Sequence, residues 1–334
     1  MINKTYKLTG LVLILTLALA SSSVMAKKKL AQTGFQFLSV GSDARASAMG
    51  DAYTISGIGA NSLFYNPAGL SGMTTQFDVA VNYNTWIADI NHSSFAMAYN
   101  PMGGRYGVFG VSVNWINYGD FEGTMVWSNA KGYVDTEIFS PSAISIGLGY
   151  AKSLTDRFFV GGQIKHVAQS LGRSVTKDDV NGGLETKKNI ASAMAIDFGT
   201  IYNTGFKSLA FGMSVRNFSQ EFKYEEESFQ LPLTFKMGIS MNVLDFYENA
   251  SGDHHLILAI DAVHPRSYPE YINIGFDYTF MDLFSLRGGY VSNQDEQNIS
   301  YGFGISKFGF AFDYAYTPFG VFENVQRITA RFSL

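Results

Sequence analysis

Ten charged residues stand in segments where every second residue is apolar, and they occupy the alternate positions, so they share the small or polar face of those segments. Because mixed charges on one buried face usually pair, the pattern favours an ion-pair network that fills an interior. A selective pore or a site for an anionic ligand is the alternative function of the same side chains. The ten residues are Lys165, Arg216, Lys236, Arg287, Arg327 and Arg331, with Asp197, Asp261, Asp277 and Asp313.

A second group of charges is acidic only and lies in one stretch, Ser219 to Leu231. Such a segment can dock a basic patch on a partner, or bind Ca²⁺ through its carboxylates. An acidic loop that is simply solvated is the plainer interpretation. The four residues are Glu221, Glu225, Glu226 and Glu227.

The motif Asn66-Pro67-Ala68-Gly69 is the third candidate site. Proline disfavours a helical conformation for the residue before it, and glycine allows the chain to turn tightly. We interpret the motif as a structural turn. A gate on a path for hydrophobic compounds is the alternative.

Composition excludes several other kinds of chemistry. The chain has no cysteine, which removes disulfides, thiolate catalysis and thiolate metal ligands. Its net charge of -4 offers no basic footprint for nucleic acid. His166 could act as a base, but the sequence places no serine or carboxylate constellation with it. We expect no enzymatic activity, no cofactor, no metal site and no nucleic-acid partner.

The elements that must position the charged residues are strands. The last residues show the pattern: Ile328, Ala330, Phe332 and Leu334 alternate with polar residues, as in a strand with one apolar face. About fourteen segments between Phe77 and Leu334 repeat it, with large apolar residues on one face and Gly, Ser, Ala or charge on the other. So many strands of this kind are hard to bury in a soluble sandwich. The sequence predicts an all-β fold, a transmembrane antiparallel β-barrel with an even number of strands.

The connections support the same fold, because barrels of outer membranes have short periplasmic turns and long extracellular loops. Three connections are long and polar: Asn117 to Pro141, Ser170 to Asn189, and Ser219 to Leu231. With a periplasmic N-terminus, all three are predicted to be extracellular. Leu244 to His254 is the exception, because it is long and predicted to be periplasmic.

The N-terminal residues predict two further segments. Residues 1–26 combine basic residues, an apolar run from Leu8 to Ala20 and a cleavage site at Val24-Met25-Ala26, as in a secretory signal peptide. An uncleaved anchor is the alternative, although the apolar run is short for a span. A membrane protein without a spanning helix must be a closed barrel, so we place the chain in the cell outer membrane.

Residues 27–76 are predicted to form a small hatch at the periplasmic mouth of the barrel formed by residues 77–334. An ordinary soluble cap is the alternative. Ala44 to Met49 should form a short helix capped by Asp43 or Ser42. Asn61 should cap a second turn that ends near Tyr65.

Motifs at the two ends of the chain resemble the PorV/PorQ family of outer-membrane proteins, which are themselves similar to FadL-type barrels. At the N-terminal end they are Gly41 to Gly50 (G-S-D-A-R-A-S-A-M-G) and Leu63 to Leu70 (L-F-Y-N-P-A-G-L). At the other end they are Asp313 to Gly320 (D-Y-A-Y-T-P-F-G) and Asn324 to Arg327 (N-V-Q-R). The sequence looks closer to PorV than to PorQ.

The resemblance implies a fourteen-stranded barrel of the type IX secretion system, surrounded by outer-membrane lipid. Such a protein binds the C-terminal signal domain of secreted cargo that leaves an SprA-like translocon. It then carries the cargo to a PorU-like attachment complex, and we expect the extracellular loops to make the contact. The FadL-like relatives imply the alternative, transport of fatty acids or other hydrophobic ligands past residues 66–70.

Overall fold

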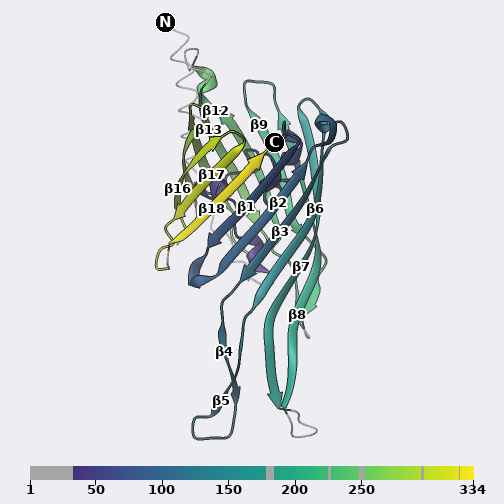
Figure 1. Cartoon of the computed structure of the whole chain (residues 1–334), viewed down its shortest axis with the longest axis vertical. Coiled ribbons are helices and arrows are strands. Elements are labelled where there is room, and N and C mark those ends of the chain that lie inside the picture. Colours follow the sequence, from purple (N-terminus) through teal and green to yellow (C-terminus); the bar gives the residue numbers. More distant parts are fainter. Residues whose placement is uncertain (1–32, 178–183, 225–226, 248–252, 295–296, 323) are drawn as a thin grey trace.

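A computed structural model describes residues 33–177, 184–224, 227–247, 253–294, 297–322 and 324–334. The predicted signal peptide, Glu225 and Glu226 lie outside these residues. Within them, fourteen strands close into one antiparallel barrel, and β1 pairs with β18 to complete the ring (Figure 1). The predicted fold class and the strand number are therefore confirmed.

The barrel strands follow one another around the ring in chain order. The first seven are β1 (Phe77–Thr85), β2 (Asn91–Tyr99), β3 (Val108–Asn117), β6 (Ser142–Thr155), β7 (Phe158–Lys177), β8 (Leu184–Asn203) and β9 (Ala210–Phe218). The remaining seven are β12 (Thr234–Asn242), β13 (His254–Pro265), β14 (Tyr271–Phe280), β15 (Phe284–Val291), β16 (Ile299–Lys307), β17 (Phe310–Thr317) and β18 (Val325–Ser333).

Burial alternates along the strands as the period of two predicts. In β1, Ala80 and Asn82 are buried in the lumen, whereas Val81 and Tyr83 are exposed on the outer face. Large apolar side chains are exposed in this way all around the barrel. An outer surface of this kind suits hydrocarbon rather than water.

The two ends of the barrel differ in their connections. At one end, here called the long-loop end, β4 (Phe121–Val126) pairs with β5 (Tyr133–Phe139), and β10 (Phe222–Tyr224) pairs with β11 (Glu227–Phe229). The hairpins β4–β5 and β7–β8 project well beyond the rest of the barrel (Figure 1). The three long connections predicted from the sequence lie at this end and contain paired strands, in which alternating side chains continue the strand pattern.

The opposite end, here called the short-turn end, has mostly tight connections. The exception expected from the sequence is present: β12 and β13 are joined by a longer connection that includes η6 (Val243–Phe246). At this end the 3-10 segment η5 (Pro101–Gly104) joins β2 to β3, whereas η4 (Ile87–Asp89) joins β1 to β2 at the long-loop end. Within the described residues, no helix has the length and apolar character needed to cross a membrane.

The segment before β1 fills the lumen. It contains η1 (Gln36–Ser39), α2 (Ala44–Ala48), η2 (Ala60–Phe64) and η3 (Pro67–Gly72). The Gly34 N–H donates to the Gln230 carbonyl at the long-loop end (3.1 Å), and the Asn100 side chain donates to the Met73 carbonyl at the short-turn end (3.0 Å). The segment, called the hatch below, thus extends through the whole lumen and not only one mouth.

Two local predictions for the hatch have different outcomes. Asp43 caps α2, because its side chain accepts from the Arg45 N–H (3.0 Å). Asn61 does not cap η2, which begins after Gly59. The Asn61 side chain instead exchanges hydrogen bonds of 3.1 Å with Asn82 on β1. A long-range amide pair has replaced the local cap that the sequence suggested.

Candidate functional site

The hatch lies directly against the barrel wall at wall positions that lack a side chain. A Cβ atom at Gly161 on β7 would lie 2.5 Å from the Ala68 nitrogen and from two Pro67 atoms. A Cβ atom at Gly199 on β8 would lie 1.8 Å from the Asn66 Oδ1 atom. Glycine is the residue that permits such a close backbone approach. The Asn66–Gly69 motif therefore packs directly against inward-facing glycines of the barrel strands, which we call the seat of the motif.

The motif itself is held by hydrogen bonds in both directions. Asn66 Oδ1 accepts from the Ala68 N–H (3.1 Å), which fixes the turn into η3. Its Nδ2 atom donates to the Thr54 carbonyl (2.7 Å) in the hatch and to the Thr200 carbonyl (3.3 Å) in β8. Gly69 has no room for a Cβ atom, which would lie 2.0 Å from the Gly57 carbonyl oxygen. These contacts support the structural interpretation of the motif rather than the gate.

All ten predicted lumenal charges lie on the inner face of the barrel, and some of them meet. Lys165 and Asp197 form an ion pair of 2.7 Å between β7 and β8. Arg287 contacts both Asp277 (3.1 Å) and Asp313 (2.6 Å) across β14, β15 and β17. Each of these five side chains is buried, where an ion pair is stable only if it is well compensated.

The basic members of the set also bind the hatch backbone. Arg216 donates to the Leu38 carbonyl (3.3 Å), Lys236 to the Asp51 carbonyl (3.1 Å), and Arg327 to the Gly41 carbonyl (3.3 Å). The Gly41 and Asp51 carbonyls lie outside the helices of the hatch, and the Leu38 carbonyl lies in the short 3-10 helix η1. Because an unpaired buried carbonyl is costly, the three wall residues serve the hatch as hydrogen-bond partners that regular structure would otherwise supply.

The acidic members of the set accept hydrogen bonds from N–H groups of the hatch. Asp261 accepts from the backbone N–H of Tyr53 and of Thr54, both at 3.0 Å, and from the Thr54 hydroxyl at 2.7 Å. Carboxylates that accept several hydrogen bonds are among the strongest buried acceptors. The lumenal charges therefore connect wall to hatch as much as wall to wall.

Sequence reasoning missed two members of this set, Arg45 and Asp78. Arg45 of α2 contacts Asp277 at 3.0 Å, so that Asp277 bridges a hatch arginine and a wall arginine. Asp78 on β1 pairs with Arg331 (2.7 Å) and accepts from the Ala60 N–H (2.8 Å). Asp78 stands at an inward position of the period-two pattern, which was the available signal.

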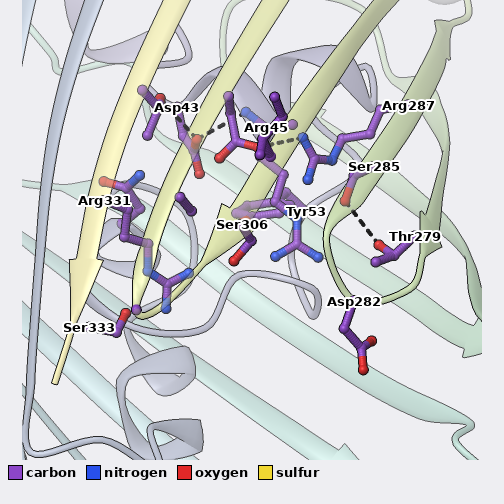
Figure 2. Close-up of a pocket in the computed structure, with 17 residues that line it drawn as sticks. Asp43, Arg45, Tyr53, Thr279, Asp282, Ser285, Arg287, Ser306, Arg331 and Ser333 are labelled. Carbon is purple, nitrogen blue, oxygen red and sulfur yellow. Dashed lines mark hydrogen bonds and ion pairs between the residues drawn. The ribbon is translucent and has the colours of Figure 1, made fainter. Parts of the chain in front are cut away.

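A polar cavity of about 320 Å³ lies between α2 and the wall formed by β14 to β18. Figure 2 shows Arg45, Arg287 and Arg331 pointing into this space together with Asp43. Burial raises the pKa of the Asp43 carboxyl above its ordinary value, and the nearby Asp313 raises it further. The higher pKa favours the neutral form of Asp43, whereas the neighbouring Asp313 carboxylate pairs with Arg287 at 2.6 Å.

The predicted acidic loop is only partly described. Glu221 and Glu227 are exposed on the β10–β11 hairpin, and Gln230 donates to the Glu221 side chain. Residues Phe35, Phe37 and Leu38 of the hatch pack beneath this hairpin in an apolar cluster with Leu231. No group of three or more His, Asp or Glu side chains among the described residues is placed to bind a metal ion.

A feature that sequence reasoning missed is the apolar surface of the β4–β5 hairpin. Val126 is 89% exposed and Ile138 is 67% exposed, and Phe121, Tyr133 and Val134 are exposed as well. Val126 pairs with Tyr133, and Val134 pairs with Met125 on the opposite face, so apolar side chains are exposed on both faces of the hairpin. Apolar side chains grouped on a projecting hairpin are available for protein or lipid contact. The signal in the sequence was alternation inside a segment that reads as a loop.

A family model described as type IX secretion system protein PorV matches residues 23–254. Among solved structures, the CymD monoaromatic hydrocarbon channel has a TM-score of 0.60 at 13% identity and covers 88% of this chain and 98% of its own. The toluene transporter TodX of Pseudomonas putida has a TM-score of 0.57 at 12% identity, covering 91% and 98%. A FadL homologue of Pseudomonas aeruginosa has a TM-score of 0.55 at 11% identity, and the match covers 87% of this chain and 98% of the homologue. These three show that the barrel has the FadL-like fold. No curated protein matches the sequence.

Proposed function

The chain belongs to the PorV family of type IX secretion system proteins, and from this premise we propose that it binds a secreted partner at its long-loop end and shuttles it to an attachment complex. The protein is an outer-membrane barrel. In such barrels the long loops are extracellular and the short turns periplasmic. The projecting β4–β5 and β7–β8 hairpins would then stand on the side where secreted proteins emerge (Figure 1).

The observation that carries the proposal is the exposed apolar surface of β4–β5. Val126 and Ile138 expose apolar surface to water. Each side chain would stabilise a complex by about 1.5–3 kcal/mol if a partner buried it fully. Glu221, just before β10, and Glu227 in β11 are exposed at the same end of the barrel, and their carboxylates would favour a partner with basic residues at its edge. The proposed partners are secreted cargo, an SprA-like translocon and a PorU-like attachment complex.

The contents of the lumen also favour binding over conduction. The hatch contacts the wall from the Phe35 cluster at one end to Met73 at the other. The cavity beside α2 is lined mainly by polar and charged residues. Such a filled lumen suits a protein whose working surface is outside the barrel.

Transport of hydrophobic small molecules is the second candidate, and the FadL-like fold favours it. The hatch motif would then mark the path of the ligand. Against this, Leu63 and Leu70 are packed against the wall at Gly110 and Gly149, so apolar side chains of the chain itself occupy the space beside the motif. Bound fatty acid recovered near residues 66–70 would favour transport.

Replacing Val126 and Ile138 together by serine should reduce co-purification of the secreted partner at least about tenfold, because two apolar anchors are lost. The measurement is a pull-down of the tagged protein from its outer membrane, with mass spectrometry of the recovered proteins. The matched control is Phe308→Ser, which removes an apolar side chain that is 86% exposed at the short-turn end. Unchanged recovery with the hairpin variant would contradict the proposal.

A further inference from the structure

Two adjoining hollows on the outside of the barrel form one groove beside β7. The first, of about 430 Å³, is mainly apolar, and its walls include Trp115, Ile144, Ala168 and Ile190. The second, of about 380 Å³, is polar and includes Glu137, Arg173 and Lys188. Ser170 and Ile190 line both hollows. The groove therefore passes continuously from an apolar end to a charged end.

Local backbone structure explains why the groove exists. The register of β7 against β8 shifts between Ser170 and Arg173, and Gly172 has a φ of +91°, which glycine adopts without strain. A Cβ atom at Gly172 would lie 2.3 Å from the Phe139 ring. The bulge thus lets Phe139 of β5 lie against β7, which forms the side wall of the charged hollow.

The level of the groove relative to the bilayer follows from strand length. A barrel strand crosses the hydrocarbon in about 9–11 residues. Counted from the start of β7 at Phe158, the crossing ends near Ala168. Trp115 lies near the long-loop end of β3, where aromatic side chains mark the interface. The apolar hollow therefore faces the outer leaflet, and Arg173 and Lys188 stand at the level of its headgroups.

The basic side chains at the charged end of the groove are available to a ligand. Arg173 and Glu137 are 3.9 Å apart and about half exposed, and an ion pair of this kind contributes little. Lys188 is exposed and has no carboxylate partner among the residues that the structure describes. With Glu137 paired, one positive charge remains uncompensated, and both basic groups suit phosphate oxygens.

We propose that this groove binds a phosphorylated, multiply acylated glycolipid of the outer leaflet, of the lipopolysaccharide class. Acyl chains lie along Trp115, Ile144 and Ile190, and a headgroup phosphate contacts Arg173 and Lys188. The outer leaflet is the source of the ligand because the groove opens toward lipid at the long-loop end. This site is separate from the hatch, and it adjoins the partner surface on β4–β5 proposed above, because Ile138 also lines the charged hollow.

The test uses the full-length protein in detergent, with purified diphosphoryl lipid A as the probe and native mass spectrometry as the readout. The wild-type protein should retain lipid A, and the double variant Arg173→Glu with Lys188→Glu should retain at least about tenfold less, because each basic residue near an anionic headgroup contributes to binding. Ala168→Trp, which fills the apolar hollow without changing charge, should have a similar effect. Lys223→Glu, a single charge reversal on the β10–β11 hairpin, is the control and should leave retention unchanged.

Three results would overturn the proposal. The first is equal retention by the double variant and the wild type. The second is equal retention of dephosphorylated lipid A, which would show ordinary annular lipid. The third is unchanged lipid retention with loss of another barrel protein from pull-downs, which would make the groove a protein interface. A difference in migration on SDS gels between unboiled and boiled samples shows whether each variant has a folded barrel.

Discussion

Gly161→Ala should lower the free energy of unfolding by about 3 kcal/mol, at the upper end of the usual cost of overpacking. The added methyl group would lie 2.5 Å from three backbone atoms of Pro67 and Ala68. Backbone atoms within a turn fixed by Asn66 cannot move aside as a flexible side chain could. The hatch must therefore leave its seat or the strand must shift, and urea unfolding in detergent measures the loss.

The next residue supplies the control. Gly162 faces the opposite side of β7, and a Cβ atom there would have its nearest neighbour at 3.5 Å, an ordinary contact. Gly162→Ala should change stability by less than about 0.5 kcal/mol, as surface substitutions usually do. If both variants lose stability equally, the effect comes from the strand rather than from the seat of the hatch.

Asp277→Ala should have the largest effect of any lumenal charge substitution, about 3–5 kcal/mol of unfolding free energy. Asp277 is buried and contacts Arg45 of the hatch and Arg287 of the wall at 3.0 and 3.1 Å. Removing it leaves one guanidinium without its carboxylate and the other with Asp313 alone. Loosening of α2 should also appear as faster proteolysis of the hatch in detergent.

Asp282→Ala is the matched substitution at the edge of the same cavity. Its carboxylate pairs with His255 at 3.2 Å, but both side chains are exposed, so we expect a change of less than about 1 kcal/mol. Equal losses for Asp277→Ala and Asp282→Ala would mean that the lumenal contacts do not hold the hatch.

The barrel could be predicted from sequence because period-two alternation is a local signal. It places Asp277 and Arg287 on the inner face, and it gives the number of strands in the barrel. It also predicts correctly the long connection after β12. Lumenal charge and small side chains recur at the same period, so the inner face is readable without knowledge of any contact.

The contacts of the hatch could not be predicted in this way, because they join residues far apart in the sequence. Arg45 lies in a predicted short helix, and nothing in the local sequence indicates its partner, Asp277. Asn61 reads as a helix cap, yet its partner is Asn82. The apolar surface of β4–β5 was missed for another reason: strand pairing outside the membrane has no lumen to make one face polar.

The most direct test of the proposed function is site-specific photo-crosslinking in cells. A photoreactive amino acid is introduced at Val126 on the β4–β5 hairpin or at Phe308 in the turn between β16 and β17, two positions of similar exposure at opposite ends of the barrel. We predict a crosslinked secreted protein from position 126 and none from position 308. A secreted partner captured only from position 308, or none from position 126 in a correctly inserted barrel, would contradict binding at the long-loop end.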